Sequence, residues 1–90
     1  LDEFYDPIFR WLDEYSNDPN DITVFEVKLI YYNTASSKAL LKILQKLEKL
    51  STNGYKVKIN WYYDAKDEEL LIAGEDYAEL IKIPFDFIQR

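Results

Sequence analysis

The chain changes from one hydrophobic spacing to another near residue 36. Over residues 22–32 the apolar side chains occupy every second position: Phe25, Val27, Leu29 and Tyr31. Glu26 and Lys28 fall between them, and this period of two is typical of a strand with one buried face. Further along, apolar residues recur at helical spacing: Leu40, Ile43, Leu44, Leu47 and Leu50. The pattern predicts a strand over residues 22–32 and a helix over residues 36–52.

The same reading predicts the other elements. A first helix is indicated by an apolar face made of Phe4, Ile8, Trp11, Leu12 and Tyr15. The long helix should end at Asn53, with Gly54 as its C-cap. Residues 55–63 alternate as a second strand, with one face formed by Val57, Ile59, Trp61 and Tyr63. A helix over residues 67–81, with a break at Gly74, and a short strand from Ile83 complete the chain.

The first two strands and the helix between them predict a parallel pair joined by a crossover connection. One face of this sheet carries polar residues from both strands: Glu26, Lys28, Lys56, Lys58 and Asn60. We therefore expect the helices to gather mainly on the other face. Alternation places Tyr32 and Tyr62 on the polar face, where we expect them to be exposed partner-binding residues, because tyrosine is enriched at interfaces. Trp61 should belong to the core.

Three hydroxyls lie where the first strand ends and the long helix begins: Thr34, Ser36 and Ser37. A helix start presents unpaired N–H groups and the positive end of the macrodipole, which favour an anion, including a phosphate on a nearby hydroxyl. One hydroxyl is enough to cap the helix, and Ser36 or Ser37 is predicted to do so because the helical pattern begins at Leu40. Thr34 would then lie outside the helix with a free hydroxyl.

Composition narrows the functional classes. Ninety residues make one small domain, residues 1–90, and 48% of them are hydrophobic, which is enough for a core. The absence of Cys and His excludes disulfides and cysteine catalysis and removes the commonest general base and metal ligand. The net charge of −6 disfavours nucleic acid and anionic membranes as partners. With no signal peptide or membrane span visible, we expect a cytoplasmic protein without metal or cofactor.

Two charged clusters each leave two interpretations open. One side of the long helix carries Lys38, Lys42, Lys46 and Lys49. This lysine stripe is either a solvated face or a docking surface for an acidic partner, and Lys38 could neutralise a phosphate on Thr34 one turn away. The second cluster opens the next helix and consists of Asp64, Asp67, Glu68 and Glu69. These carboxylates either complement the helix dipole or bind a divalent cation, although their spacing is not that of an EF-hand.

Residues 29–41, LIYYNTASSKALL, resemble the N-T-S/A-S-S-K/R signature of the SiaC-type regulatory phosphoproteins, formerly a bacterial domain of unknown function. Three further segments support the resemblance: residues 4–15, residues 57–64 (VKINWYYD) and residues 73–85. Together they cover nearly the whole chain in order. The family's N-terminal segment, which reads as a strand pair, has no counterpart before Leu1, so the chain is expected to lack those strands.

The resemblance implies an α/β fold of the STAS-like type, with a small mixed sheet and helices mainly on one face. It also implies a regulatory phosphoprotein that works by partner switching. In this family a protein kinase phosphorylates one threonine, and a PP2C-type phosphatase removes the phosphate. The unphosphorylated form binds and activates a diguanylate cyclase, which links the switch to cyclic-di-GMP and biofilm formation. Carried over by position, the phosphorylated residue is Thr34.

The sequence therefore predicts a non-enzymatic adaptor that regulates a partner enzyme. The resemblance implies that this enzyme is a diguanylate cyclase. The residues predicted to bind the partner are Asn33, Ser36, Ser37, Lys38, Lys42, Tyr32 and Tyr62. Two other functions stay open at this point. One is a small acidic metal-dependent enzyme, and the other is a protein-interaction module without a switch.

Overall fold

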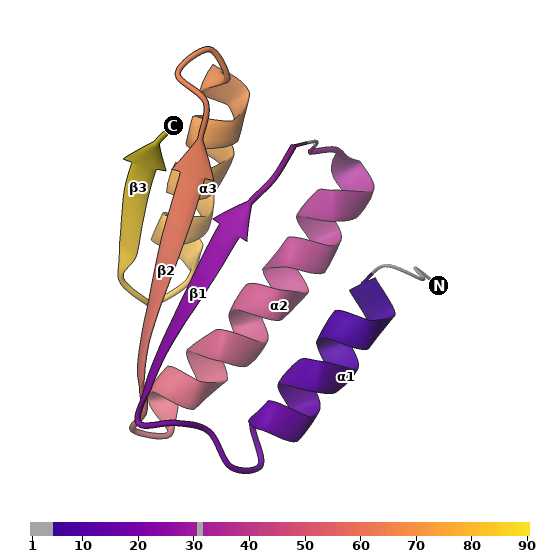
Figure 1. Ribbon diagram of the computed structural model, residues 1–90, viewed down its shortest axis with the longest axis vertical. Coiled ribbons are helices and arrows are strands. Elements are labelled where there is room, and N and C mark those ends of the chain that lie inside the picture. Colours follow the sequence, from indigo (N-terminus) through magenta and orange to yellow (C-terminus); the bar gives the residue numbers. More distant parts are fainter. Residues whose placement is uncertain (1–4, 31) are drawn as a thin grey trace.

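A computed structural model describes residues 5–30 and 32–90 (Figure 1). The chain forms three helices and three strands in this order: α1 (Tyr5–Tyr15), β1 (Ile22–Lys28), α2 (Thr34–Thr52), β2 (Lys56–Tyr63), α3 (Glu68–Leu80) and β3 (Phe85–Gln89). Every element predicted from the hydrophobic spacing is present. Phe4 and Tyr31, which the pattern assigns to the first helix and the first strand, lie outside the described residues.

The strands form one sheet in the order β1-β2-β3, and both neighbouring pairs are parallel. Val27 lies opposite Trp61, and Trp61 lies opposite Phe87. The predicted α/β class and the parallel pairing of the first two strands are confirmed. The mixed sheet implied by the resemblance is not seen within residues 5–30 and 32–90, where all three strands run the same way.

In Figure 1, α3 lies behind the strands, α2 runs beside β1, and α1 lies on the far side of α2 from the sheet. The core forms where α2 and α3 pack on the sheet. Side chains that are fully buried here come from β2 and α2: Ile59, Trp61, Leu44 and Leu47. α1 adds Leu12, and α3 adds Leu70 and Tyr77. The other sheet face has no helix over it among the described elements, so the expectation of helices mainly on one face is confirmed.

Several boundaries differ from the prediction. β1 ends at Lys28 rather than at residue 32, and α2 begins two residues early, at Thr34. Asn53, not Gly54, is the C-cap of α2, and Gly54 follows with φ of 101°, a value that favours glycine. α3 is not broken at Gly74. A Cβ at Gly74 would lie 2.6 Å from Trp61 Nε1, so the glycine allows α3 to approach β2 closely.

Trp11 departs from the predicted apolar face of the first helix. Its side chain is 52% exposed and stacks on Tyr15 with ring centroids 5.1 Å apart. Leu12 takes the buried position instead. Within residues 5–30 and 32–90, none of the helices is both long and apolar enough to span a membrane.

Candidate functional site

The chain between β1 and α2 forms a corner in which Asn33 begins the helix. Asn33 has an extended backbone, with φ of −142° and ψ of −175°, as an N-cap residue normally does. Its Oδ1 accepts a hydrogen bond from Ser36 N at 2.8 Å and a second from Ser36 Oγ at 3.1 Å. The prediction that Ser36 or Ser37 caps the helix is therefore wrong, because the amide of Asn33 takes that role.

Both serines hold this corner together from inside the first turn of α2. Ser36 is 7% exposed, with its hydroxyl bonded to the cap. Ser37 is half-buried, and its Oγ donates to the Thr34 carbonyl at 2.8 Å while its N–H donates to the Asn33 carbonyl at 2.8 Å. These bonds leave Ser36 little surface for a partner. The predicted partner-binding role of Asn33, Ser36 and Ser37 stays a prediction.

Thr34 is the first helical residue, not a residue outside the helix as predicted, and it is exposed. Among the described residues its hydroxyl has no hydrogen-bond partner, because Asn33 supplies the cap. The first turn of α2 contains no acidic residue. A negative group on Thr34 would therefore meet free N–H groups and the positive end of the helix dipole, without a neighbouring carboxylate in that turn to oppose it.

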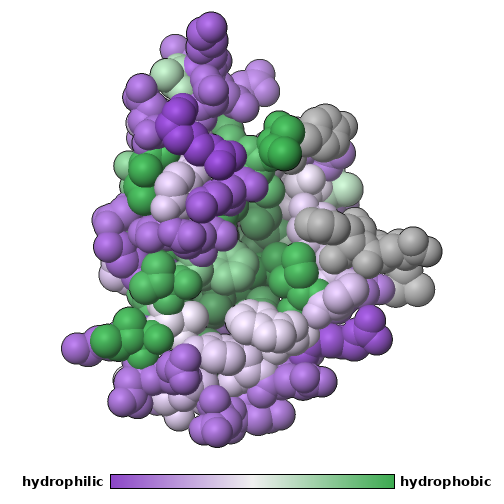
Figure 2. All heavy atoms as spheres, in the orientation of Figure 1, coloured by the Kyte–Doolittle hydropathy of each residue, from purple (hydrophilic) through white to green (hydrophobic). Residues whose placement is uncertain are grey.

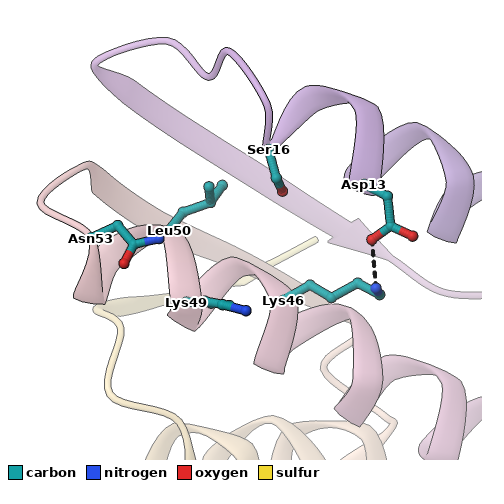
Figure 3. A pocket seen from close by; sticks show the side chains of 6 residues that line it. All are labelled: Asp13, Ser16, Lys46, Lys49, Leu50 and Asn53. Atoms are coloured by element: carbon teal, nitrogen blue, oxygen red, sulfur yellow. Dashed lines mark hydrogen bonds and ion pairs between the residues drawn. The ribbon is translucent and has the colours of Figure 1, made fainter.

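The lysine stripe divides into two parts in the structure. Lys38 and Lys42 are exposed, and Lys42 Nζ lies 5.0 Å from the centre of the Phe9 ring. Lys46 Nζ is 2.6 Å from Asp13 Oδ1 and so ties α2 to α1. Figure 3 shows these two side chains pointing toward each other across a groove of about 280 Å³ between the helices. Lys49 is exposed as well, so Lys46 is the member of the stripe that pairs with a carboxylate among the described residues, and Lys38 and Lys42 are the exposed lysines nearest Thr34.

Tyr32 is half-buried and packs against the core, so the expectation that it is exposed on the open sheet face is wrong. Its hydroxyl oxygen lies 2.8 Å from that of Tyr77 on α3, and the Tyr77 hydroxyl donates to the Ser37 carbonyl at 2.8 Å. Burial, helped by the bond to Tyr32, raises the pKa of Tyr77 well above its usual range. Sequence spacing could not reveal Tyr77, because its partners lie 40 and 45 residues away.

Tyr62 lies on the open sheet face, as predicted, but it is half-buried there rather than exposed. It donates to Glu26 Oε2 at 2.7 Å, and this bond lowers the pKa of the Glu26 carboxyl. Lys28 Nζ and the Arg90 guanidinium lie 4.8 and 5.9 Å from its ring centre. Figure 2 shows hydrophobic residues between hydrophilic ones on the side of the molecule that faces the viewer. Tyr62 is therefore on the opposite side of the sheet from α2, and no hydrogen bond, ion pair or ring contact among residues 5–30 and 32–90 joins it to the corner.

The acidic cluster has a local structural role. The Asp67 side chain caps α3 by accepting from Leu70 N at 3.0 Å, and Asp64 accepts from Lys66 N at 2.8 Å. Within the part of the chain that the structure describes, there is no group of three or more acidic side chains placed to hold a metal ion. The contacts therefore favour the interpretation that these carboxylates complement the N-terminal end of α3.

These features define a small α/β domain with one open sheet face and an exposed hydroxyl at the start of its longest helix. The family model for SiaC family regulatory phosphoproteins matches residues 1–90. The chain therefore belongs to the SiaC family, as its sequence predicted, and it is a regulatory protein rather than an enzyme. This family membership also removes the metal-dependent enzyme from the functions left open.

Solved structures of Pseudomonas aeruginosa SiaC have the same fold. The chain matches SiaC alone with a TM-score of 0.84 and 28% identity, covering 98% of this chain and 70% of that one. It matches a crystal structure of the diguanylate cyclase SiaD in complex with its activator SiaC with a TM-score of 0.86 and 27% identity, covering 98% and 72%. An uncharacterized protein of P. aeruginosa strain UCBPP-PA14 is 29% identical over 83 residues, which are 92% of this chain and 66% of that relative. The chain thus spans slightly less than two thirds of that relative's length.

Proposed function

We propose that this chain is an adaptor that binds and regulates a diguanylate cyclase in the cytoplasm when Thr34 is unphosphorylated. A protein kinase would add the phosphate, and a PP2C-type phosphatase would remove it. Membership of a family of regulatory phosphoproteins supports the class of function, and the P. aeruginosa complex of SiaC with SiaD supports the kind of partner. The observation that carries the choice of residue is the exposed Thr34 hydroxyl, which has no bonding partner among the described residues.

The switch works locally, through charge and bulk at the contact surface. A phosphate adds roughly −1.5 to −2 charge at neutral pH. At Thr34 it would sit over the free N–H groups of α2 and one turn from Lys38, so the folded chain tolerates it. A partner that approaches the corner with acidic or apolar groups would instead meet a strongly hydrated anion. The unphosphorylated corner, extended by Lys38 and Lys42, is therefore the binding-competent surface.

The first test maps the modification. The chain is incubated with its cognate kinase, and the phosphorylated residue is identified by mass spectrometry. Modification should fall on Thr34, because the Ser36 and Ser37 hydroxyls are bonded within the corner. Phosphate confined to Ser36 or Ser37 would contradict the assignment, and no modification at all would favour an interaction module without a switch.

The second test locates the partner surface by calorimetric titration with the cyclase from the same organism. Thr34→Glu places a negative charge at the corner, and Gln45→Glu places one on an exposed position further along α2 as a matched control. Thr34→Glu should weaken binding by about tenfold or more, and Gln45→Glu by much less. Equal affinities would move the interface away from the corner. A large fall in stability of Thr34→Glu would show that the corner is structural instead.

A further inference from the structure

Tyr77 reaches the corner from the core. It is 7% exposed, and its single hydroxyl proton goes to the Ser37 carbonyl, which can only accept. The hydrogen bond between the Tyr77 and Tyr32 hydroxyls must therefore be donated by Tyr32. The result is a directed chain from Tyr32 to Tyr77 to the carbonyl of Ser37, which we call the tyrosine clamp.

The tyrosine clamp holds the corner on both sides of Thr34. Tyr32 lies two residues before Thr34, and Ser37 lies three residues after it. The other bonds of the corner, from Ser36 and Ser37 to Asn33 and Thr34, stay within it and cannot fix its position relative to the rest of the domain. The Tyr77 hydroxyl ties the corner to the rest of the domain, because Tyr77 belongs to a different helix, α3.

The base of the clamp is fixed by tight packing. The Tyr77 ring lies 5.6 Å from the ring of Trp61, which is fully buried. Trp61 Nε1 donates to the Leu70 carbonyl at 3.0 Å, and Gly74 leaves no room for a side chain between α3 and the indole. The Tyr77 hydroxyl therefore has a defined position from which to hold the corner.

We infer that Tyr77 is a positioning residue for the switch, whose hydroxyl holds Thr34 and its neighbours in the geometry that the partner protein binds. This role rests on the function proposed above. A corner that is already ordered loses less conformational entropy when a partner binds, so its affinity is higher than that of the same residues in a mobile loop. A merely structural tyrosine would instead affect folding stability without a specific effect on the corner or on the partner.

The test uses Tyr77→Phe, which keeps the ring against Trp61 and removes only the hydroxyl. Tyr55→Phe is the control, since Tyr55 also packs against the core, although it is only half-buried, and it precedes β2 at the opposite end of the sheet from the corner. Amide hydrogen exchange is measured first, without any partner. Exchange of residues 32–38 should rise by about 5-fold in Tyr77→Phe, as expected for one lost hydrogen bond, while exchange in β2 stays unchanged.

Cyclase affinity is measured next on the same variants, with Tyr32→Phe and the double variant added. Tyr77→Phe should bind about 5-fold more weakly than Tyr55→Phe, and adding Tyr32→Phe to it should have little further effect because the shared bond is already lost. Unchanged exchange in residues 32–38 overturns the clamp itself. Faster exchange with an affinity equal to that of Tyr55→Phe overturns the positioning role. Failure of the unmodified chain to bind the cyclase would instead refute the proposed function, whatever the exchange shows.

Discussion

Replacing Asn33 by alanine removes the acceptor that starts α2. The Asn33 side chain accepts from both the N–H and the hydroxyl of Ser36, and Ser36 is 7% exposed. Loss of an N-cap side chain costs about 1 kcal/mol. The buried Ser36 hydroxyl also loses its acceptor, and a hydrogen bond of this kind contributes about 1 kcal/mol. Asn33→Ala should therefore lower the free energy of unfolding by about 1–2 kcal/mol.

Urea denaturation followed by tryptophan fluorescence measures this loss. With a slope of about 1 kcal/mol per molar urea for a chain this small, the midpoint should fall by about 1–2 M. Asn33→Asp keeps an acceptor at the cap and should retain most of the stability. Asn17→Ala is the control, because Asn17 is exposed and its side chain makes no hydrogen bond to the described residues. It should unfold at the midpoint of the unmodified chain.

Thr34→Val provides the contrast on which the account of the corner depends. It keeps the branched side chain and removes a hydroxyl that bonds to nothing in the described structure, so it should cost less than about 0.5 kcal/mol. The reasoning would be refuted if Asn33→Ala unfolded at the midpoint of the unmodified chain, or if Thr34→Val were the less stable of the two. The first result would mean that Asn33 is not the cap, and the second would mean that the Thr34 hydroxyl is engaged and not free for modification.

Three other predictions follow from the packing and charge of the domain. Gly74→Ala should destabilise the fold by about 1–3 kcal/mol in thermal melts, because its Cβ would lie 2.6 Å from Trp61 Nε1, whereas Glu75→Ala on the exposed side should be close to neutral. Burial and the bond to Tyr32 raise the pKa of Tyr77, so its contribution to stability is complete below the unfolded tyrosine pKa of about 10 and is lost as the pH rises further. Melts above about pH 10 should therefore lose less stability in Tyr77→Phe than in the unmodified chain, and an equal loss would contradict this. Phosphorylation of Thr34 should stabilise the free domain by about 0.3–1 kcal/mol through the helix dipole, and a lower melting temperature after kinase treatment would contradict the account.

The order and type of the elements could be predicted because the buried residues repeat at regular intervals. Val57, Ile59 and Trp61 alternate along β2, and all three are buried. The leucines of α2 likewise mark the face that packs on the sheet. Such positions are read from spacing alone because a sheet covered on one face needs its apolar side chains on that face.

The start of α2 could not be placed in the same way. The first turn contributes only Ser36 to the buried face, so the leucine pattern begins later than the helix itself. Asn, Ser and Thr are all good N-caps, and the sequence offers several of them in a row. The choice of Asn33 depends on the backbone path out of β1, which ends at Lys28, and local sequence does not determine that path.

The exposure of single aromatic residues could not be predicted either, because it depends on contacts between residues far apart in the sequence. Alternation places Tyr32 on the open face only if the strand continues to it, but β1 has ended four residues earlier. The side chain instead reaches Tyr77, 45 residues away. Trp11 is the opposite case, because the helical pattern predicts it to be buried, whereas it is exposed. The apolar face of a helix is broad, and Leu12 fills the position against the core.

Cyclase activity measured with the phosphorylated and the unphosphorylated chain tests the central claim most directly. The chain is treated with its kinase until phosphorylation is complete, and the rate of cyclic-di-GMP formation by the cyclase is followed as each form is added. The account predicts that the unphosphorylated chain changes the rate, that the phosphorylated chain does not, and that kinase treatment has no effect on Thr34→Val. The account would be contradicted if the two forms changed the cyclase rate equally. It would also be contradicted if kinase treatment of Thr34→Val abolished the effect of that variant on the cyclase rate.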